Sequence, residues 1–158
     1  MKRPAVGALA LAVGLAFSAG AMADGMTKRQ YQFLGKNIET EYLAARKACN
    51  SLADNALDIC IVQANGRMNV ARAELESSYD PSIKNRYKAR EASISANYAV
   101  AIEKCDDASD NSRETCVKYA KSAKTYEMAI ALLDHRDSKD DADVQEKTAG
   151  INAVSSGK

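Results

Sequence analysis

The sequence predicts an all-α fold of four helices in two tandem antiparallel hairpins, each closed by a disulfide, followed by a disordered C-terminal tail. Three observations carry this prediction. Apolar residues recur every three or four positions, the chain repeats itself after 56 residues, and its four cysteines fall into two C-x10-C pairs. No segment alternates between apolar and polar residues as a strand would. The length of 158 residues allows one modest domain or two very small ones.

Residues 1–23 have the pattern of a secretory signal peptide. Lys2 and Arg3 precede an apolar stretch, and Ala21-Met22-Ala23 forms a cleavage motif before Asp24. The apolar stretch of roughly 13 residues is shorter than the ~20 that a membrane-spanning helix needs, and no later segment is more apolar. We therefore expect cleaved export to the periplasm and no transmembrane segment in the mature chain.

An internal duplication divides the remainder of the chain. A shift of 56 residues places one copy over residues 24–80 and a second over residues 81–137, with Pro81 at the boundary. The pairs that coincide under this shift include Tyr31 with Tyr87, Ile38 with Ile94, Tyr42 with Tyr98, Ala45 with Ala101, Cys49 with Cys105 and Cys60 with Cys116. Each copy is therefore expected to be one supersecondary unit.

Each copy contains two helical arms separated by a turn. The first arm spans about residues 31–52 and the second about 57–75, and in the second copy the arms span about 83–105 and 116–133. Residues 50–55 and 106–111 are rich in Asn, Asp and Ser, which favour turns and caps. We predict capping boxes that pair Asn55 with Asp58 and Asn111 with Glu114, so that a new helix starts at each asparagine.

The four cysteines lie in the mature chain and are expected to form two disulfides in an oxidising compartment. Hairpins would pair Cys49 with Cys60 and Cys105 with Cys116. Two unbroken long helices would instead pair Cys49 with Cys116 and Cys60 with Cys105, because positions eleven apart share a helix face. The poor helix formers between the cysteines favour the first pairing. Periodicity leaves open whether the hairpins stack into a bundle or remain extended.

Residues 138–158 are polar and show no sustained apolar period, so we expect a disordered tail there.

Composition excludes several classes of function. The chain has 22 basic and 21 acidic residues with no long basic block, which argues against nucleic-acid binding. The single histidine, His135, leaves few candidates for acid–base chemistry, so we expect no catalytic residues, no enzyme activity and no cofactor. The cysteines lack the spacing of zinc sites, and we expect no metal.

Two groups of residues remain as candidates for binding. Tyr31, Tyr42, Tyr87 and Tyr98 recur in both copies and are candidate partner-binding residues, although such tyrosines also fill the seams between helices. The acidic turn residues could gather a metal or small ligand, but they lack the D-x-D-x-D-G pattern of calcium loops. These acids are Asp106, Asp107, Asp110 and Glu114.

Several motifs between residues 36 and 130 resemble a family of small exported proteobacterial helical proteins with paired C-x10-C turns. The motifs are Ala73-Glu74-Leu75-Glu76, Pro81-Ser82, the stretch from Asn85 to Arg90, and Lys104-Cys105-Asp106-Asp107. Members of this family are often labelled as Tol-Pal-type cell-envelope biogenesis proteins. Their turns commonly read Ser-Gly-Asn, whereas this chain has Ala53-Asp54-Asn55 and Ser109-Asp110-Asn111. The resemblance implies a location in the cell envelope and no mechanism.

The sequence therefore predicts a non-enzymatic periplasmic protein that binds unknown envelope proteins in envelope maintenance or stress response, and it allows a homo-oligomer. The alternatives are a chaperone-like holdase, or metal or small-ligand binding by the acidic turns.

Overall fold

The computed structural model describes residues 25–155, apart from the side chains of residues 110, 111 and 150–155. The described chain forms four α-helices, with one short 3-10 turn and no strand among these residues. The helices are α1 (Lys28–Cys49), α2 (Asp54–Tyr79), α3 (Ile83–Lys104) and α4 (Asp110–Ser155), and the 3-10 turn is η1 (Cys105–Asp107). The predicted all-α class and its four helices are confirmed, while the predicted signal peptide lies outside the described residues.

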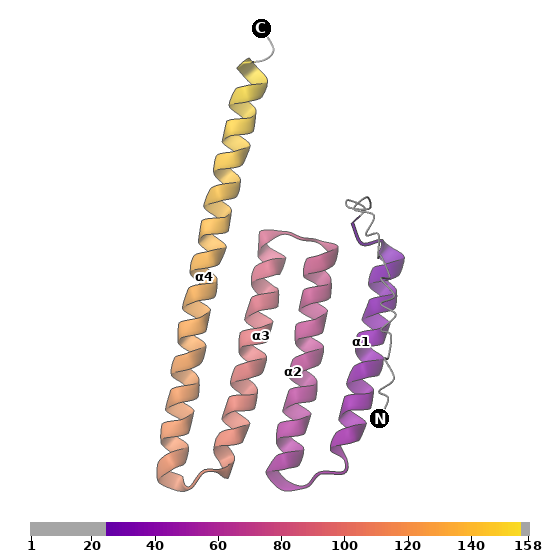
Figure 1. Cartoon of the computed structure of the whole chain (residues 1–158), viewed down its shortest axis with the longest axis vertical. Helices are drawn as coiled ribbons and strands as arrows, with labels where there is room; N and C mark the ends of the chain where they lie inside the picture. Colours follow the sequence, from indigo (N-terminus) through magenta and orange to yellow (C-terminus); the bar gives the residue numbers. More distant parts are fainter. Residues whose placement is uncertain (1–24, 156–158) are drawn as a thin grey trace, which may run out of the picture.

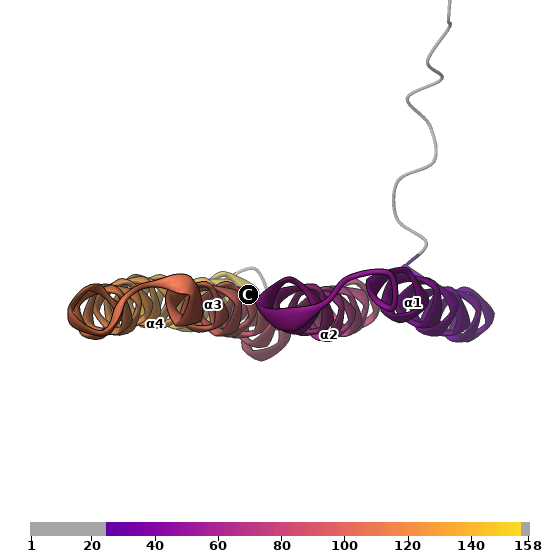
Figure 2. The same cartoon turned by 90° about the horizontal axis from the view of Figure 1, so that it is seen from below.

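The four helices lie side by side in one layer (Figure 1). Seen from below, the layer is one helix thick, and α1 and α4 form its two edges (Figure 2). Packing follows the chain, because α1 packs on α2, α2 on α3, and α3 on α4. The contact between the hairpins, α2 on α3, is the most extensive. The hairpins therefore neither stack into a four-helix bundle nor extend into a rod.

Each hairpin is closed near its turn by the disulfide that the sequence favours. Cys49 bonds to Cys60 and Cys105 bonds to Cys116, with Cα–Cα distances of 5.6 and 5.7 Å. Cys49 and Cys105 are fully buried. A bridge across so short a loop contributes about 3 kcal/mol in the loop-entropy model.

The starts of α1 and α3 follow common capping rules. Thr27 accepts a hydrogen bond from the backbone N–H of Gln30, whose side chain accepts one from the backbone N–H of Thr27, which makes a capping box. Ser82 caps α3 by accepting from the backbone N–H of Asn85. The buried Asn85 side chain also donates to the backbone and side-chain oxygens of Asp80, which fixes the turn between the two copies.

The predicted capping box at Asn55 and Asp58 is wrong. Ala53 occupies the N-cap position of α2, and no side chain among the described residues caps this helix. The Asn55 amide instead donates to the backbone carbonyl of Glu103, 3.2 Å away at the end of α3. The preceding residue, Asp54, has a φ of 49°, in the left-handed region that favours glycine.

The capping role predicted for Asn111 falls on a side chain outside the described part of the chain. Its predicted partner, Glu114, forms an ion pair of 2.7 Å with Lys118 one turn along the helix.

The interior of the layer consists mainly of small side chains. The buried hydrophobic residues are Cys49, Ala64, Ile94, Cys105, Ala120 and Ala131. Two pairs among them, Cys49 with Cys105 and Ala64 with Ala120, are equivalent under the 56-residue repeat. At the contact between the hairpins, a Cβ added to Gly66 would lie 2.9 Å from the Cβ of Ala96. Gly66 therefore lets α2 and α3 approach closely.

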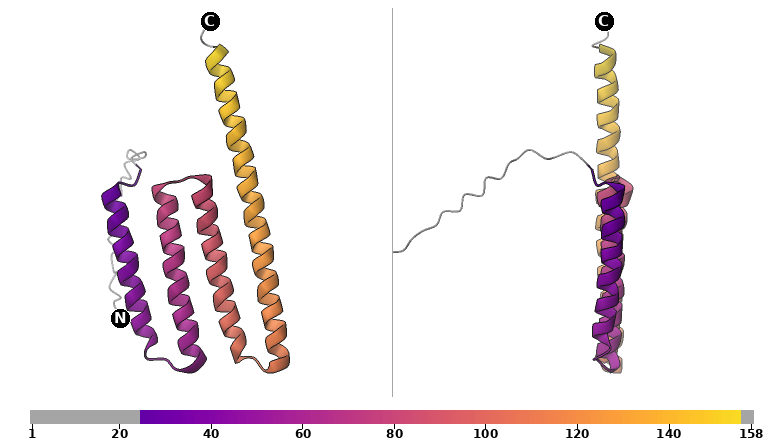
Figure 3. Two further views of the ribbon diagram at one scale, coloured as in Figure 1. Left: turned by 180° about the vertical axis from the view of Figure 1, so that it is seen from behind. Right: turned by 90° about the vertical axis from the view of Figure 1, so that its right-hand side faces the viewer.

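The tail differs from its prediction. α4 continues as a helix through Ser155, about 70 Å in length, and projects beyond the other helices (Figure 3). Every side chain from Lys139 to Ala149 is exposed, so this part packs on nothing among the described residues. The missing apolar period agrees with this lack of packing, but it did not exclude a helix, because residues added to the end of the packed part of α4 avoid the cost of helix nucleation.

Candidate functional site

The predicted tyrosines of the first copy lie in the seam between α1 and α2. The Tyr31 hydroxyl donates to Glu76 Oε2 at 2.7 Å, and its ring centroid lies 4.5 Å from that of Tyr79. The hydrogen bond to Glu76 raises the pKa of Tyr31 above 10.0, and desolvation and the negative charge of Glu76 raise it further. The Tyr42 hydroxyl donates to Asn65 Oδ1 at 2.9 Å.

The predicted tyrosines of the second copy lie in the seam between α3 and α4. The ring centroid of Tyr87 lies 4.8 Å from that of His135, and Lys124 Nζ lies 4.6 Å from the centroid of the Tyr98 ring. His135 Nδ1 is buried and finds no hydrogen-bond partner among the described residues. Arg90 and Asp134 form a long ion pair of 3.9 Å across the same seam.

All four predicted tyrosines are therefore half-buried and bridge helices of their own hairpin. This placement favours the alternative that they fill the seams. Their proposed role in partner binding stays a prediction.

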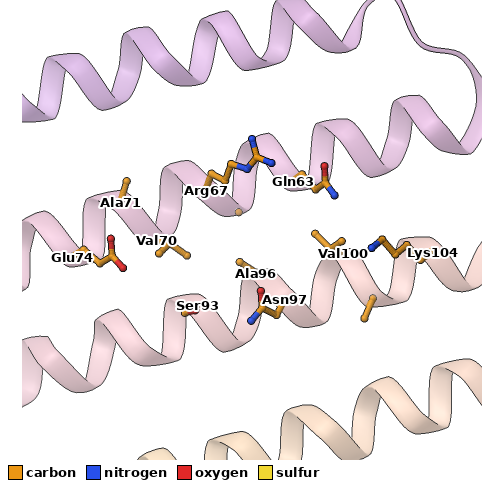
Figure 4. Close-up of a pocket in the computed structure, with 12 residues that line it drawn as sticks. Gln63, Arg67, Val70, Ala71, Glu74, Ser93, Ala96, Asn97, Val100 and Lys104 are labelled. Atoms are coloured by element: carbon orange, nitrogen blue, oxygen red, sulfur yellow. The ribbon is translucent and has the colours of Figure 1, made fainter. Parts of the chain in front are cut away.

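A groove of about 600 Å³ runs along the contact between α2 and α3 (Figure 4). Val70 and Val100 contribute apolar side chains, and the close pair Gly66 and Ala96 lies between them. Charged side chains lie along the same groove, which gives it both apolar and ionic character. The charged lining residues are Arg67, Glu74 and Lys104.

The charges are unevenly distributed along the groove. Lys104 lies toward the disulfide turns, Arg67 lies near the middle of the groove, and Glu74 lies toward the opposite end (Figure 4). Such an arrangement can orient a bound segment that carries an acidic residue near one end.

The acidic turn of the second copy already has an internal cation. Arg113 donates to Asp106 Oδ1 through Nε at 2.8 Å and through its terminal nitrogen Nη2 at 2.6 Å. Within the described residues, no group of three or more His, Cys, Asp or Glu side chains could hold a metal ion. The metal alternative stays a prediction.

The sequence interpretation missed an exposed apolar surface on α4. Tyr119, Tyr126 and Leu133 follow one another at seven-residue spacing and are 79%, 69% and 54% exposed. A second exposed group lies on α1, where Phe33 and Leu43 are 62% and 60% exposed. The seven-residue spacing was the available signal, because positions seven apart share a helix face.

None of the helices formed by residues 25–155 is both long and apolar enough to cross a membrane. Comparisons of the chain with family models, with curated proteins and with solved structures find no match, so the resemblance to exported proteobacterial proteins stays a prediction.

Proposed function

We propose that this protein is a non-enzymatic, periplasmic binding protein that receives segments of other envelope proteins in its α2–α3 groove, in envelope maintenance or stress response. The single observation that carries the proposal is the groove itself. It is about 600 Å³ in volume, and the one-layer fold leaves it uncovered by any other described helix.

The lining of the groove fits a peptide segment. Val70 and Val100 offer apolar surface, whose burial on binding provides the main driving force. Arg67 and Lys104 offer charges that fix the orientation of the bound segment more than they add affinity. The expected ligand is therefore an amphipathic segment with a carboxylate near the end that faces Lys104.

The proposed location rests on three supports. The signal-peptide pattern of residues 1–23 predicts export, and two disulfides fit an oxidising compartment such as the periplasm. The resemblance to exported proteobacterial proteins implies the same location.

Site-specific photo-crosslinking in intact cells tests the groove. A photoreactive residue replaces Arg67, which is exposed and lines the groove, or Asn69, which is exposed and points away from it on the same helix. The proposal expects a short, reproducible set of envelope proteins attached at position 67 and a tenfold weaker set at position 69. Equal capture at both positions, or no capture at either, would contradict it.

A chaperone-like holdase is the second candidate, and the exposed apolar residues of α1 and α4 favour it. A holdase would capture many unfolded proteins, and stoichiometric amounts would slow the aggregation of a chemically denatured client. Failure to slow aggregation, together with a short crosslinked set at position 67, would exclude this candidate.

A further inference from the structure

The exposed apolar residues of α4 occupy a face that is covered in the first copy. Under the 56-residue repeat, Tyr119, Ser122 and Tyr126 are the counterparts of Gln63, Gly66 and Val70. These three residues of α2 face α3 at the contact between the hairpins. We call Tyr119, Ser122, Tyr126 and Leu133 the α4 edge. The α4 edge is equivalent to the face of α2 that packs against α3, but no described helix packs against the α4 edge.

The exposed face of α1 is equivalent to the face of α3 that packs against α2. Its residues Asn37, Thr40 and Ala44 are the counterparts of Ser93, Ala96 and Val100, which face α2 from α3. Phe33 extends this face by one turn toward the start of the helix, and Leu43 lies beside it. We call Phe33, Asn37, Thr40, Leu43 and Ala44 the α1 edge.

We propose that a second copy of this chain docks its α1 edge onto the α4 edge, repeating between molecules the α2–α3 contact that exists within one molecule. The two edges lie at opposite ends of the layer, so each new copy would extend the layer (Figure 2). The contact is head-to-tail, and such contacts produce open chains or closed rings rather than symmetric dimers.

The register of the α2–α3 contact brings complementary residues together. Gly66 lies against Ala96, and their counterparts Ser122 and Thr40 would therefore lie opposite each other. Counting three residues away from this antiparallel pair in each helix places Tyr119 opposite Leu43. Two strongly exposed apolar side chains would thus cover one another.

The other direction along the helices also matches. Tyr126 is four residues after Ser122, and Lys36 is four residues before Thr40, so these two side chains would lie opposite each other. The ring and the cation would then pair as Tyr98 and Lys124 do.

Seven residues from the same starting pair, Phe33 would lie opposite Ala129, between Tyr126 and Leu133 on the α4 edge. A large side chain therefore meets a small one.

The sizes of the side chains agree with a wider helix separation at this contact. A Cβ on Gly66 would already lie 2.9 Å from the Cβ of Ala96, so Ser122 and Thr40 cannot approach as closely. Helices held farther apart need larger side chains to exclude water. The change from Gln63 and Val70 to Tyr119 and Tyr126 supplies them.

Sedimentation velocity of the mature, disulfide-bonded chain tests the proposal across micromolar to high micromolar concentrations. The average mass is expected to rise with concentration and to exceed that of a dimer. The edge variants Phe33→Glu and Tyr126→Glu are each expected to weaken self-association at least about tenfold, because each buries a charge in the contact. A chain that stays monomeric throughout would overturn the proposal.

Mixing the two edge variants distinguishes a head-to-tail contact from a symmetric one. Phe33→Glu retains an intact α4 edge and Tyr126→Glu retains an intact α1 edge, so an equal mixture is expected to form a one-to-one dimer and nothing larger. If Phe33→Glu self-associates like the natural chain, or if the mixture stays monomeric, the head-to-tail contact is wrong.

Matched controls place the same charge beside each edge. Gln32→Glu and Thr125→Glu alter exposed residues one position along, about 100° around each helix. Both are expected to associate as the natural chain does. Weakened association in these controls would show that charge alone, rather than the edge, sets the effect.

Discussion

The ring centroid of His135 lies 4.8 Å from that of Tyr87, in the place that Tyr79 occupies against Tyr31 in the first copy. In both pairs the tyrosine, Tyr31 or Tyr87, lies near the start of α1 or α3, whereas the disulfide turn follows the end of that helix. Each hairpin is therefore held by a disulfide at one end and by an aromatic contact toward the other. The second copy retains this aromatic contact with His135 in place of the second tyrosine.

Replacing His135 with tyrosine is expected to stabilise the protein by about 1 kcal/mol. The change removes the buried Nδ1 that has no partner among the described residues, and it restores the tyrosine pair of the first copy. Urea denaturation at pH 7 measures the change. The reverse substitution, Tyr79→His, is the matched control and is expected to destabilise by a similar amount. A loss of stability in His135→Tyr would contradict the equivalence of the two ring pairs.

Gly66 and Gly35 are expected to respond to alanine with opposite signs. A Cβ at Gly66 would lie 2.9 Å from the Cβ of Ala96, so Gly66→Ala must push α2 and α3 apart. We expect this change to lower the free energy of unfolding by about 1 to 3 kcal/mol. A Cβ at Gly35 would meet only the end of Leu75 at 3.9 Å, so Gly35→Ala should gain up to about 1 kcal/mol from helix propensity. Thermal denaturation of both variants tests the pair, and equal effects would show that the close approach is unimportant.

The sequence predicted those features that depend on local pattern. The apolar period, the turn formers between cysteines and the repeat together predicted the hairpins and the pairing of Cys49 with Cys60 and Cys105 with Cys116. They also allowed the seam positions of Tyr31 and Tyr87. These features follow from contacts within one copy, where sequence spacing fixes which residues meet.

Features that depend on contacts between the copies escaped prediction. The close packing of α2 on α3 includes the approach of Gly66 to Ala96, a contact that no periodic pattern in the sequence predicts. Asn55 fits a cap signature, yet Ala53 occupies the N-cap position, and the Asn55 amide nitrogen donates to the carbonyl of Glu103 from the other copy. Both contacts join residues of different copies, which sequence spacing within one copy does not bring together.

Asn55→Asp separates the bridge between hairpins from the predicted cap. Asparagine and aspartate cap helices about equally, so a capping role predicts little change. An aspartate carboxylate cannot donate to the Glu103 carbonyl, so loss of the bridge predicts a cost of about 1 to 2 kcal/mol. Urea denaturation near neutral pH measures the difference, and an unchanged stability would show that the hydrogen bond from Asn55 to Glu103 does not stabilise the fold.

Tyr31 is expected to make stability fall at alkaline pH. Its hydrogen bond to Glu76 raises the pKa of the folded phenol above 10.0, so folding favours the protonated form. This contribution is complete below pH 10 and is lost as the pH rises through the raised pKa. Thermal denaturation between pH 8 and 11 should show a steeper loss for the natural chain than for Tyr31→Phe.

Glu76→Gln is the control for the alkaline loss, because it removes the carboxylate that raises the pKa of Tyr31 and keeps a hydrogen-bond acceptor. Its pH profile should resemble that of Tyr31→Phe. A profile identical to that of the natural chain would assign the alkaline loss to other tyrosines.

Asp54 tests whether the turn before α2 is strained. Its φ of 49° lies in the left-handed region, where a Cβ costs about 1 kcal/mol and glycine has no penalty. Asp54→Gly should therefore be more stable than Asp54→Ala by about that amount, and comparing these two variants cancels the loss of the carboxylate at the helix start. At Ala56, two residues into α2, the order should invert, because Ala56→Gly loses about 1 kcal/mol of helix propensity. Denaturation of the three variants measures both differences in stability. If Asp54→Ala is more stable than Asp54→Gly, the turn is not strained.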